Sequence, residues 1–140
     1  MSNSTGVPAQ ILFACVHNAG RSQIAAAWLN KLADPSRARA ISAGTQPGER
    51  VHPEVLEAMR AAGIDLAGVT PRRLTDELAE NSTMLITLGC GEACPATPGL
   101  RREDWPVEDP KGKSMARVEA IRDELRGRVE ALIEREGWGS

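Results

Sequence analysis

The chain has 140 residues, the size of one ordinary domain, and we expect a single domain over residues 1–140. Hydrophobic residues make up 41% of the sequence and charged residues 26%, proportions that exclude a disordered or fibrous chain. The formal net charge of −2 provides no general attraction to nucleic acid or to an anionic membrane, so any anion must be bound by local geometry.

The N-terminus and the cysteines indicate the compartment. The first residues, MSNSTGVPAQ, carry no positive cluster followed by an apolar core, and no apolar run approaches the roughly 20 residues that span a bilayer. We therefore expect a cytoplasmic protein without membrane contact. Three cysteines are an odd number for a disulfide framework, and a reducing cytoplasm favours reactive or redox thiols.

The first part of the chain predicts a strand, a tight loop, a helix and a second strand. Residues 10–16 form a short apolar run, as in a strand buried on both faces of a parallel sheet. Residues 22–34 place apolar side chains at helical spacing and end before Pro35. Residues 38–43 indicate another short strand.

Further along, strands and helices continue to alternate. Residues 53–62 carry the start and stop signals of a helix, and residues 74–81 indicate a short one. Residues 84–89 form an apolar strand that leads to Cys90, and residues 114–136 are a long amphipathic helix. This alternation predicts an α/β sandwich around a mostly parallel sheet, with ligand chemistry at the carboxyl ends of the strands.

The most informative stretch is the loop from Cys15 to Arg21, between the first strand and the first helix. A loop of this length can direct backbone N–H groups and a helix N-terminus at a tetrahedral oxyanion, while the Arg21 guanidinium holds its oxygens. Such a positive cradle favours the thiolate of Cys15, to which Ser22 is placed to donate a hydrogen bond. The competing interpretation is a buried strand-end cysteine beside an exposed arginine.

Several motifs resemble the low-molecular-weight protein tyrosine phosphatase superfamily. They are CVHNAGRSQIAAAW at 15–28, SAG at 42–44, GIDL at 63–66 and the dipeptide Asp109-Pro110. The resemblance implies a three-layer α/β sandwich with a four-stranded, mostly parallel sheet. It also implies Asp109 as the general acid and an oxyanion-binding loop, whose residues are Val16, His17, Asn18, Ala19, Gly20, Arg21 and Ser22.

Two features separate the branches of this superfamily. Its phosphatases usually follow Asp-Pro with aromatic residues that wall a phosphotyrosine slot, whereas this chain continues Lys-Gly-Lys and contains no tyrosine. The segment GCGEACP at 89–95 instead resembles the arsenate reductase branch, in which two further cysteines, here Cys90 and Cys94, form a redox relay with the nucleophile Cys15. A phosphatase acting on small phosphorylated substrates is the alternative within the enzymes, and a non-catalytic oxyanion or arsenic sensor is the alternative outside them.

Residue spacing leaves other interpretations of two of these sites open. One helical turn separates Cα atoms at i and i+4 by about 6 Å, so a Cys90–Cys94 disulfide is feasible. An incidental pair or half of a zinc site would have the same spacing, although zinc needs four ligands and no second pair is evident. Asp109 before Pro110 also suits a simple turn.

The resemblance implies a thiol cascade that reduces arsenate for arsenic detoxification and ends on an external dithiol, most simply thioredoxin. A donor system based on glutaredoxin stays open. Phosphate and sulfate should compete as anions. We expect a monomer with no bound cofactor, no metal and no nucleic acid partner. Some members bind potassium through a glutamate on the first helix, but Ala26 stands at the matching position here.

Overall fold

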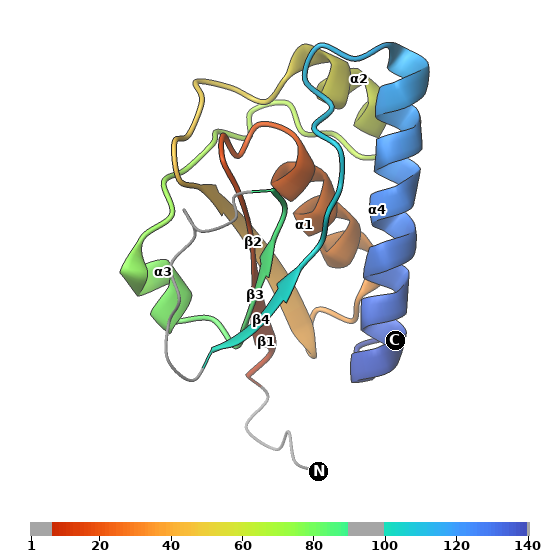
Figure 1. Ribbon diagram of the computed structural model, residues 1–140. Coiled ribbons are helices and arrows are strands. Elements are labelled where there is room, and N and C mark those ends of the chain that lie inside the picture. Colours follow the sequence, from red (N-terminus) through yellow and green to blue (C-terminus); the bar gives the residue numbers. More distant parts are fainter. Residues whose placement is uncertain (1–6, 90–99, 140) are drawn as a thin grey trace.

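A computed structural model describes residues 7–89 and 100–139. Its centre is a four-stranded sheet in the order β2-β1-β3-β4, and every neighbouring pair is parallel (Figure 1). The strands are β1 (Ala9–Cys15), β2 (Ala38–Gly44), β3 (Met84–Thr87) and β4 (Arg101–Asp104). The α/β class and the four-stranded parallel sheet expected from the sequence are confirmed.

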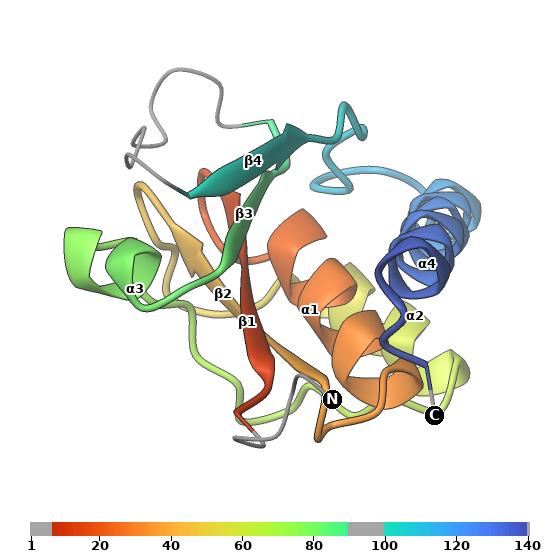
Figure 2. The ribbon, with the colours of Figure 1, turned by 90° about the horizontal axis from the view of Figure 1, so that it is seen from below.

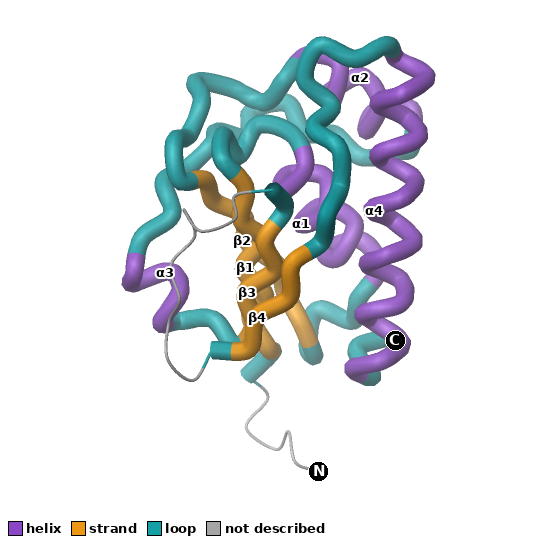
Figure 3. Tube along the Cα trace, in the orientation of Figure 1, coloured by secondary structure: helices purple, strands orange, loops and turns teal. Residues whose placement is uncertain are grey.

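Helices cover both faces of the sheet. They are α1 (Arg21–Leu32), α2 (Pro53–Ala61), α3 (Asp76–Glu80) and α4 (Met115–Glu136). Figure 2 shows α1, α2 and α4 on one face and the short α3 on the other, so the fold has three layers. The loops that follow the carboxyl ends of the strands gather at one edge of the sheet, beside the start of α1 (Figure 3).

The central strand β1 explains this layering. Its residues Ile11 and Phe13 are fully buried in the core beneath α1, α2 and α4. The alternate residues Leu12 and Ala14 are fully buried in a smaller core beneath α3. Because successive side chains of a strand point to opposite faces, a strand covered on both sides must be continuously apolar, as the sequence of β1 predicted.

Local signals set the helix boundaries. Pro53 occupies the first turn of α2, and the Ser114 hydroxyl caps α4 by accepting a hydrogen bond from the backbone N–H of Arg117 at 3.3 Å. Gly137 ends α4 in the left-handed conformation, with φ of 74°. In the described part of the chain, no helix is long and apolar enough to cross a membrane.

Hydrophobic periodicity did not indicate β4, because its sequence Arg-Arg-Glu-Asp is charged throughout and mostly exposed. Charged residues are common on edge strands, where they prevent pairing with another sheet. Arg101 joins this edge to the end of α4 by two hydrogen bonds to the Glu136 carboxylate, of 3.0 and 2.9 Å. The bonded guanidinium lowers the pKa of Glu136 to about 2.

Candidate active site

Cys15 lies where the fold favours ligand chemistry. It is the last residue of β1, pairs in register with Gly44 of β2, and is 3% exposed. β1 lies between β2 and β3, so the order in which strands are added to the sheet reverses direction at β1. In open α/β sheets, ligands bind at the carboxyl ends of strands at such a switch point.

The backbone of the loop after Cys15 is oriented by hydrogen bonds on its outer side. The carbonyl oxygens of Cys15, Val16, His17 and Ala19 accept hydrogen bonds of 2.7 to 3.1 Å from backbone N–H groups in residues 45–52. Within a planar trans peptide, the C=O and N–H point in opposite directions. The N–H groups that follow these carbonyls are therefore directed to the inner side of the loop, as an oxyanion site requires.

The Cys15 sulfur lies among donors on that inner side. The backbone N–H of Asn18 donates to Sγ at 3.2 Å, and the Ser22 hydroxyl lies 2.8 Å from it. The Asn18 side-chain Nδ2 donates to the Ser22 Oγ at 2.7 Å. Because Ser22 already accepts this bond, its own proton is free to point at the sulfur. Ser22 thus lies within hydrogen-bond distance of the sulfur to which we expect it to donate.

Asn18 shapes the loop. It is fully buried and adopts φ of 52°, a left-handed conformation that asparagine tolerates better than most residues. Its Oδ1 accepts a hydrogen bond of 2.9 Å from the backbone N–H of Arg72. Asn18 therefore fixes the shape of the loop by bonding between its side chain and the backbone.

The N-terminus of α1 follows the loop directly. Gly20 is its N-cap, and among the described residues no side chain caps it and no acidic residue occupies its first turn. The unpaired N–H groups and partial positive charge of a helix start favour an anion. The start of α1 therefore favours an anion, as the inward N–H groups of the loop do.

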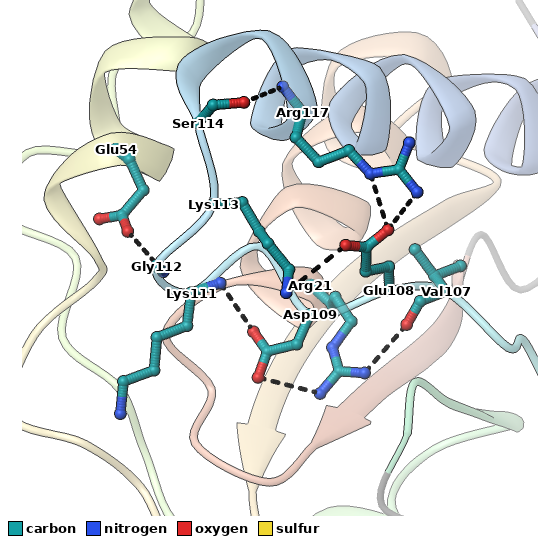
Figure 4. Close-up of polar contacts among 10 residues, drawn as sticks. All are labelled: Arg21, Glu54, Val107, Glu108, Asp109, Lys111, Gly112, Lys113, Ser114 and Arg117. Atoms are coloured by element: carbon teal, nitrogen blue, oxygen red, sulfur yellow. Dashed lines mark hydrogen bonds and ion pairs between the residues drawn. The ribbon is translucent and has the colours of Figure 1, made fainter.

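Arg21 connects this loop to a second segment. Its Nη1 donates to the Val107 carbonyl at 3.0 Å, and its Nη2 lies 3.8 Å from Oδ2 of Asp109 (Figure 4). The guanidinium also lies against Gly89, where a Cβ would be 2.3 Å from Nη1. Arg21, at the end of the loop, and Asp109, the expected general acid, are thus neighbours, although 88 positions separate them in the sequence.

Asp109 lies beside Arg21, the residue at the end of the loop. Its Oδ1 accepts a hydrogen bond of 3.0 Å from the backbone N–H of Lys111, and its side chain is 45% exposed. The next residue, Pro110, packs on Gly20 so closely that a Cβ there would lie 3.0 Å from the proline Cγ. The acid is both a turn residue and a neighbour of the loop, so the two interpretations of Asp109 are compatible.

Ion pairs and hydrogen bonds hold the segment around Asp109 on two helices (Figure 4). Glu54 of α2 accepts a hydrogen bond of 3.1 Å from the backbone N–H of Gly112. On the other side, Glu108 accepts from Arg117 of α4 at 2.8 Å and pairs with Lys113 at 3.6 Å. The bond from Arg117 lowers the pKa of Glu108. The segment is therefore fixed on either side of the acid.

The two histidines have structural contacts. His17 Nδ1 lies 3.0 Å from the Gln46 carbonyl oxygen, and the residue is partly buried. His52 is the N-cap of α2, as its place before Pro53 suggests, and its backbone N–H donates to Ala19 at 2.9 Å. Burial lowers the pKa of His52, so its ring is mostly neutral at pH 7.

The expected relay residues Cys90 and Cys94 lie outside the described residues. In the described ranges 7–89 and 100–139, Cys15 is a free buried cysteine, and no three His, Cys, Asp or Glu side chains form a group that could hold a metal ion.

The sequence did not single out Gln23, which contacts Asn18 from α1. Gln23 is 5% exposed, and its amide donates to both the backbone and the side-chain oxygen of Asn18. A polar residue on the side of a helix that faces the core was the signal that could have identified Gln23. Such a residue needs a hydrogen-bond partner, and a partner in the adjacent loop was therefore to be expected.

Known proteins are similar to this chain over most of its length. The family described as low molecular weight phosphotyrosine protein phosphatase matches residues 10–136. An arsenate reductase of Staphylococcus aureus is 34% identical over 125 residues, 86% of this chain and 92% of that protein. A thioredoxin-dependent arsenate reductase of Corynebacterium glutamicum has a TM-score of 0.79 at 35% identity, covering 96% of this chain and 69% of that one. The structure of an arsenate reductase in the phosphate binding state also has a TM-score of 0.79, at 30% identity, and the match covers 91% of this chain and 98% of that one.

Gly44 tests whether the loop geometry matters for anion binding. A Cβ at Gly44 would lie 2.6 Å from the Val16 carbonyl oxygen and 2.9 Å from the Asn18 nitrogen, so Gly44→Ala must displace the loop. We expect it to weaken binding of inorganic phosphate about tenfold or more, as measured by calorimetry. Gly48→Ala is the matched control, because its Cβ would have only ordinary contacts at 3.9 Å. Equal affinities of the two variants would contradict the expectation.

Proposed function

The chain belongs to the low molecular weight phosphotyrosine protein phosphatase family, and from this premise we propose that it reduces arsenate to arsenite with Cys15 as the nucleophile. The observation that carries the proposal is the position of the Cys15 sulfur, 3.2 Å from the Asn18 N–H and 2.8 Å from the Ser22 hydroxyl, at the base of a loop whose carbonyls face outward. The similar proteins named as arsenate reductases support the choice of reaction.

The first step is the attack of Cys15 on arsenic. Arsenate binds to the inward N–H groups of residues 16–22, and the Arg21 guanidinium supplies the positive charge at the rim. Asp109, which lies beside Arg21, protonates the departing oxygen so that it leaves as water. The product is an adduct with a sulfur–arsenic bond.

The next steps transfer two electrons. Cys90 attacks the sulfur of the Cys15 adduct, the sulfur–arsenic bond breaks with its electron pair on arsenic, and arsenite leaves. A Cys15–Cys90 disulfide remains. Cys94 then attacks the sulfur of Cys90, which releases the Cys15 thiolate and forms a Cys90–Cys94 disulfide. One arsenate is reduced for each pair of thiols oxidised.

An external dithiol completes the cycle. We assign this role to thioredoxin, which reduces the Cys90–Cys94 disulfide by thiol exchange, as the name of the similar thioredoxin-dependent reductase suggests. No bound cofactor enters this scheme. A cascade of free thiols suits the reducing cytoplasm, where we place the enzyme as a monomer formed by one domain over residues 1–140. Phosphate and sulfate would compete with arsenate because they share its charge and tetrahedral shape.

A coupled assay tests the proposal. We expect NADPH oxidation that requires arsenate, thioredoxin and thioredoxin reductase together, with no comparable rate when a glutaredoxin couple replaces the thioredoxin couple. Cys15→Ser and Arg21→Ala should each abolish it, because they remove the nucleophile or the charge that holds the anion. Turnover retained by Cys15→Ser would place the nucleophile elsewhere.

Asp109→Asn should lower the turnover number on the order of 10²-fold, the usual scale for a positioned general acid. The asparagine Oδ1 can still accept from the Lys111 N–H, so the turn should persist. Phosphate affinity should change little. Asp123→Asn, on the exposed surface of α4, is the control and should keep the wild-type rate. If Asp109→Asn were equally active, Asp109 would be only a turn residue.

The order of the relay is tested with Cys94→Ser. This variant should release about one arsenite per enzyme and then stop, because nothing within it resolves the Cys15–Cys90 disulfide. Cys90→Ser should fail earlier and not release arsenite at a comparable rate. Mass spectrometry of arsenate-treated Cys94→Ser, alkylated without reductant, should find Cys15 linked to Cys90.

The same variants separate reductase from phosphatase. A phosphatase acting on small phosphorylated substrates would use Cys15, Arg21 and Asp109 but would need neither relay cysteine. Repeated turnover of arsenate by Cys94→Ser at the wild-type rate would show that Cys94 is incidental and that the relay order is wrong.

A further inference from the structure

Gln23 is a buried polar residue that the proposed reaction does not use. It lies in the first turn of α1 and is 5% exposed. Its Nε2 donates to the Asn18 backbone oxygen at 3.0 Å and to the Asn18 Oδ1 at 3.1 Å. A buried amide with two bonds to one residue holds that residue in a fixed orientation.

The orientation of the Asn18 amide follows from its neighbours. Oδ1 faces two donors, the Gln23 Nε2 and the backbone N–H of Arg72 at 2.9 Å. A backbone N–H can only donate, so the atom opposite it must be the amide oxygen. The Asn18 nitrogen is consequently the atom that faces Ser22, at 2.7 Å from Oγ.

This orientation decides where the Ser22 proton points. Ser22 Oγ accepts from Asn18 Nδ2 and therefore donates its own proton to the Cys15 sulfur at 2.8 Å. If the amide of Asn18 were reversed, its oxygen would face Ser22 and would take that proton. The sulfur would then lose a donor that favours the thiolate, since hydrogen bonds to a charged form stabilise that form.

We propose that Gln23 is a positioning residue that fixes the Asn18 amide and so directs the Ser22 proton to Cys15, which sets the reactivity of the thiolate. Gln23 acts through Asn18 and Ser22. The inference rests on the proposed function only in taking Cys15 as the reactive thiol.

Gln23→Met is the variant of choice, because methionine has nearly the same volume and shape but no donor. Of the two donors to Asn18 Oδ1, Gln23 Nε2 and the Arg72 backbone N–H, only the second remains in this variant. The amide should then reverse part of the time. Ser22→Ala removes the hydroxyl that donates to the Cys15 sulfur and gives the full effect for comparison.

The test measures alkylation of Cys15 by iodoacetamide as a function of pH, in the full chain carrying Cys90→Ser and Cys94→Ser so that one thiol reacts. We expect Ser22→Ala to move the midpoint of this profile upward by about one pH unit. Gln23→Met should move it upward by about half a unit. The double variant Gln23→Met/Ser22→Ala should match Ser22→Ala alone, because the inferred effect of Gln23 reaches the sulfur through the Ser22 proton.

Asn30→Asp is the matched control for loss of a side-chain amide bond on the same helix. Asn30 Nδ2 donates to the Ala40 carbonyl of β2 at 3.0 Å, away from the sulfur. Its loss should lower the melting temperature without moving the alkylation profile. If Gln23→Met does not fold, Gln23→Glu replaces it in the comparison of single and double variants. The charge of the glutamate shifts the alkylation midpoint in the Ser22→Ala background as well, so that shift can be measured there and subtracted.

Two results would overturn the inference. One is a folded Gln23→Met protein with an unchanged alkylation profile, and the other is a shift that adds fully to that of Ser22→Ala. Alkylation needs no arsenate, so the result is separate from the coupled assay. A chain that shows the expected shifts but does not reduce arsenate would contradict the proposed reaction alone.

Discussion

The anion-binding loop can turn its N–H groups inward only because its carbonyl oxygens have partners on the outside. Residues 45–52 supply these partners, following directly after β2, whose last residue Gly44 pairs with Cys15. The parallel register of β1 and β2 thus brings the two segments together. Buried carbonyls without partners would be costly, so the bonds on the outer side are a condition for the donors on the inner side. The nucleophile depends on the sheet through this arrangement.

The segment around Asp109 is held in a different way, by charged surface contacts with α2 and α4. Exposed ion pairs such as Glu108 with Lys113 contribute little to stability. These ion pairs instead fix the position of the segment around Asp109, which has no hydrophobic core of its own. Close packing of Pro110 on Gly20 then sets its distance from the anion loop. Small changes in this packing should alter catalysis more than folding.

The sequence predicted those parts that depend on apolar pattern or on local motifs. β1 and α4 followed from periodicity, and the loop from Cys15 to Arg21 followed from its place between strand and helix. β4 could not be found in this way, because an exposed charged edge strand has no apolar pattern. The role of Gln23 depends on Arg72, which meets Asn18 across 54 positions. No local pattern specifies that contact, because only the assembled sheet brings these residues together.

The end of β3 is coupled to the arginine of the anion loop. Gly89 adopts φ of 88°, a conformation that side chains rarely tolerate, and the Arg21 guanidinium occupies the space where its Cβ would be. Gly89, the residue before Cys90 in the sequence, therefore lies in direct contact with Arg21. Since Arg21 also contacts Val107 and Asp109, the same guanidinium joins the end of β3 to the segment that carries the acid. An anion that drew Arg21 toward the loop would weaken its contacts with Val107 and Asp109, so binding of the substrate would be linked to the position of the segment that carries the acid.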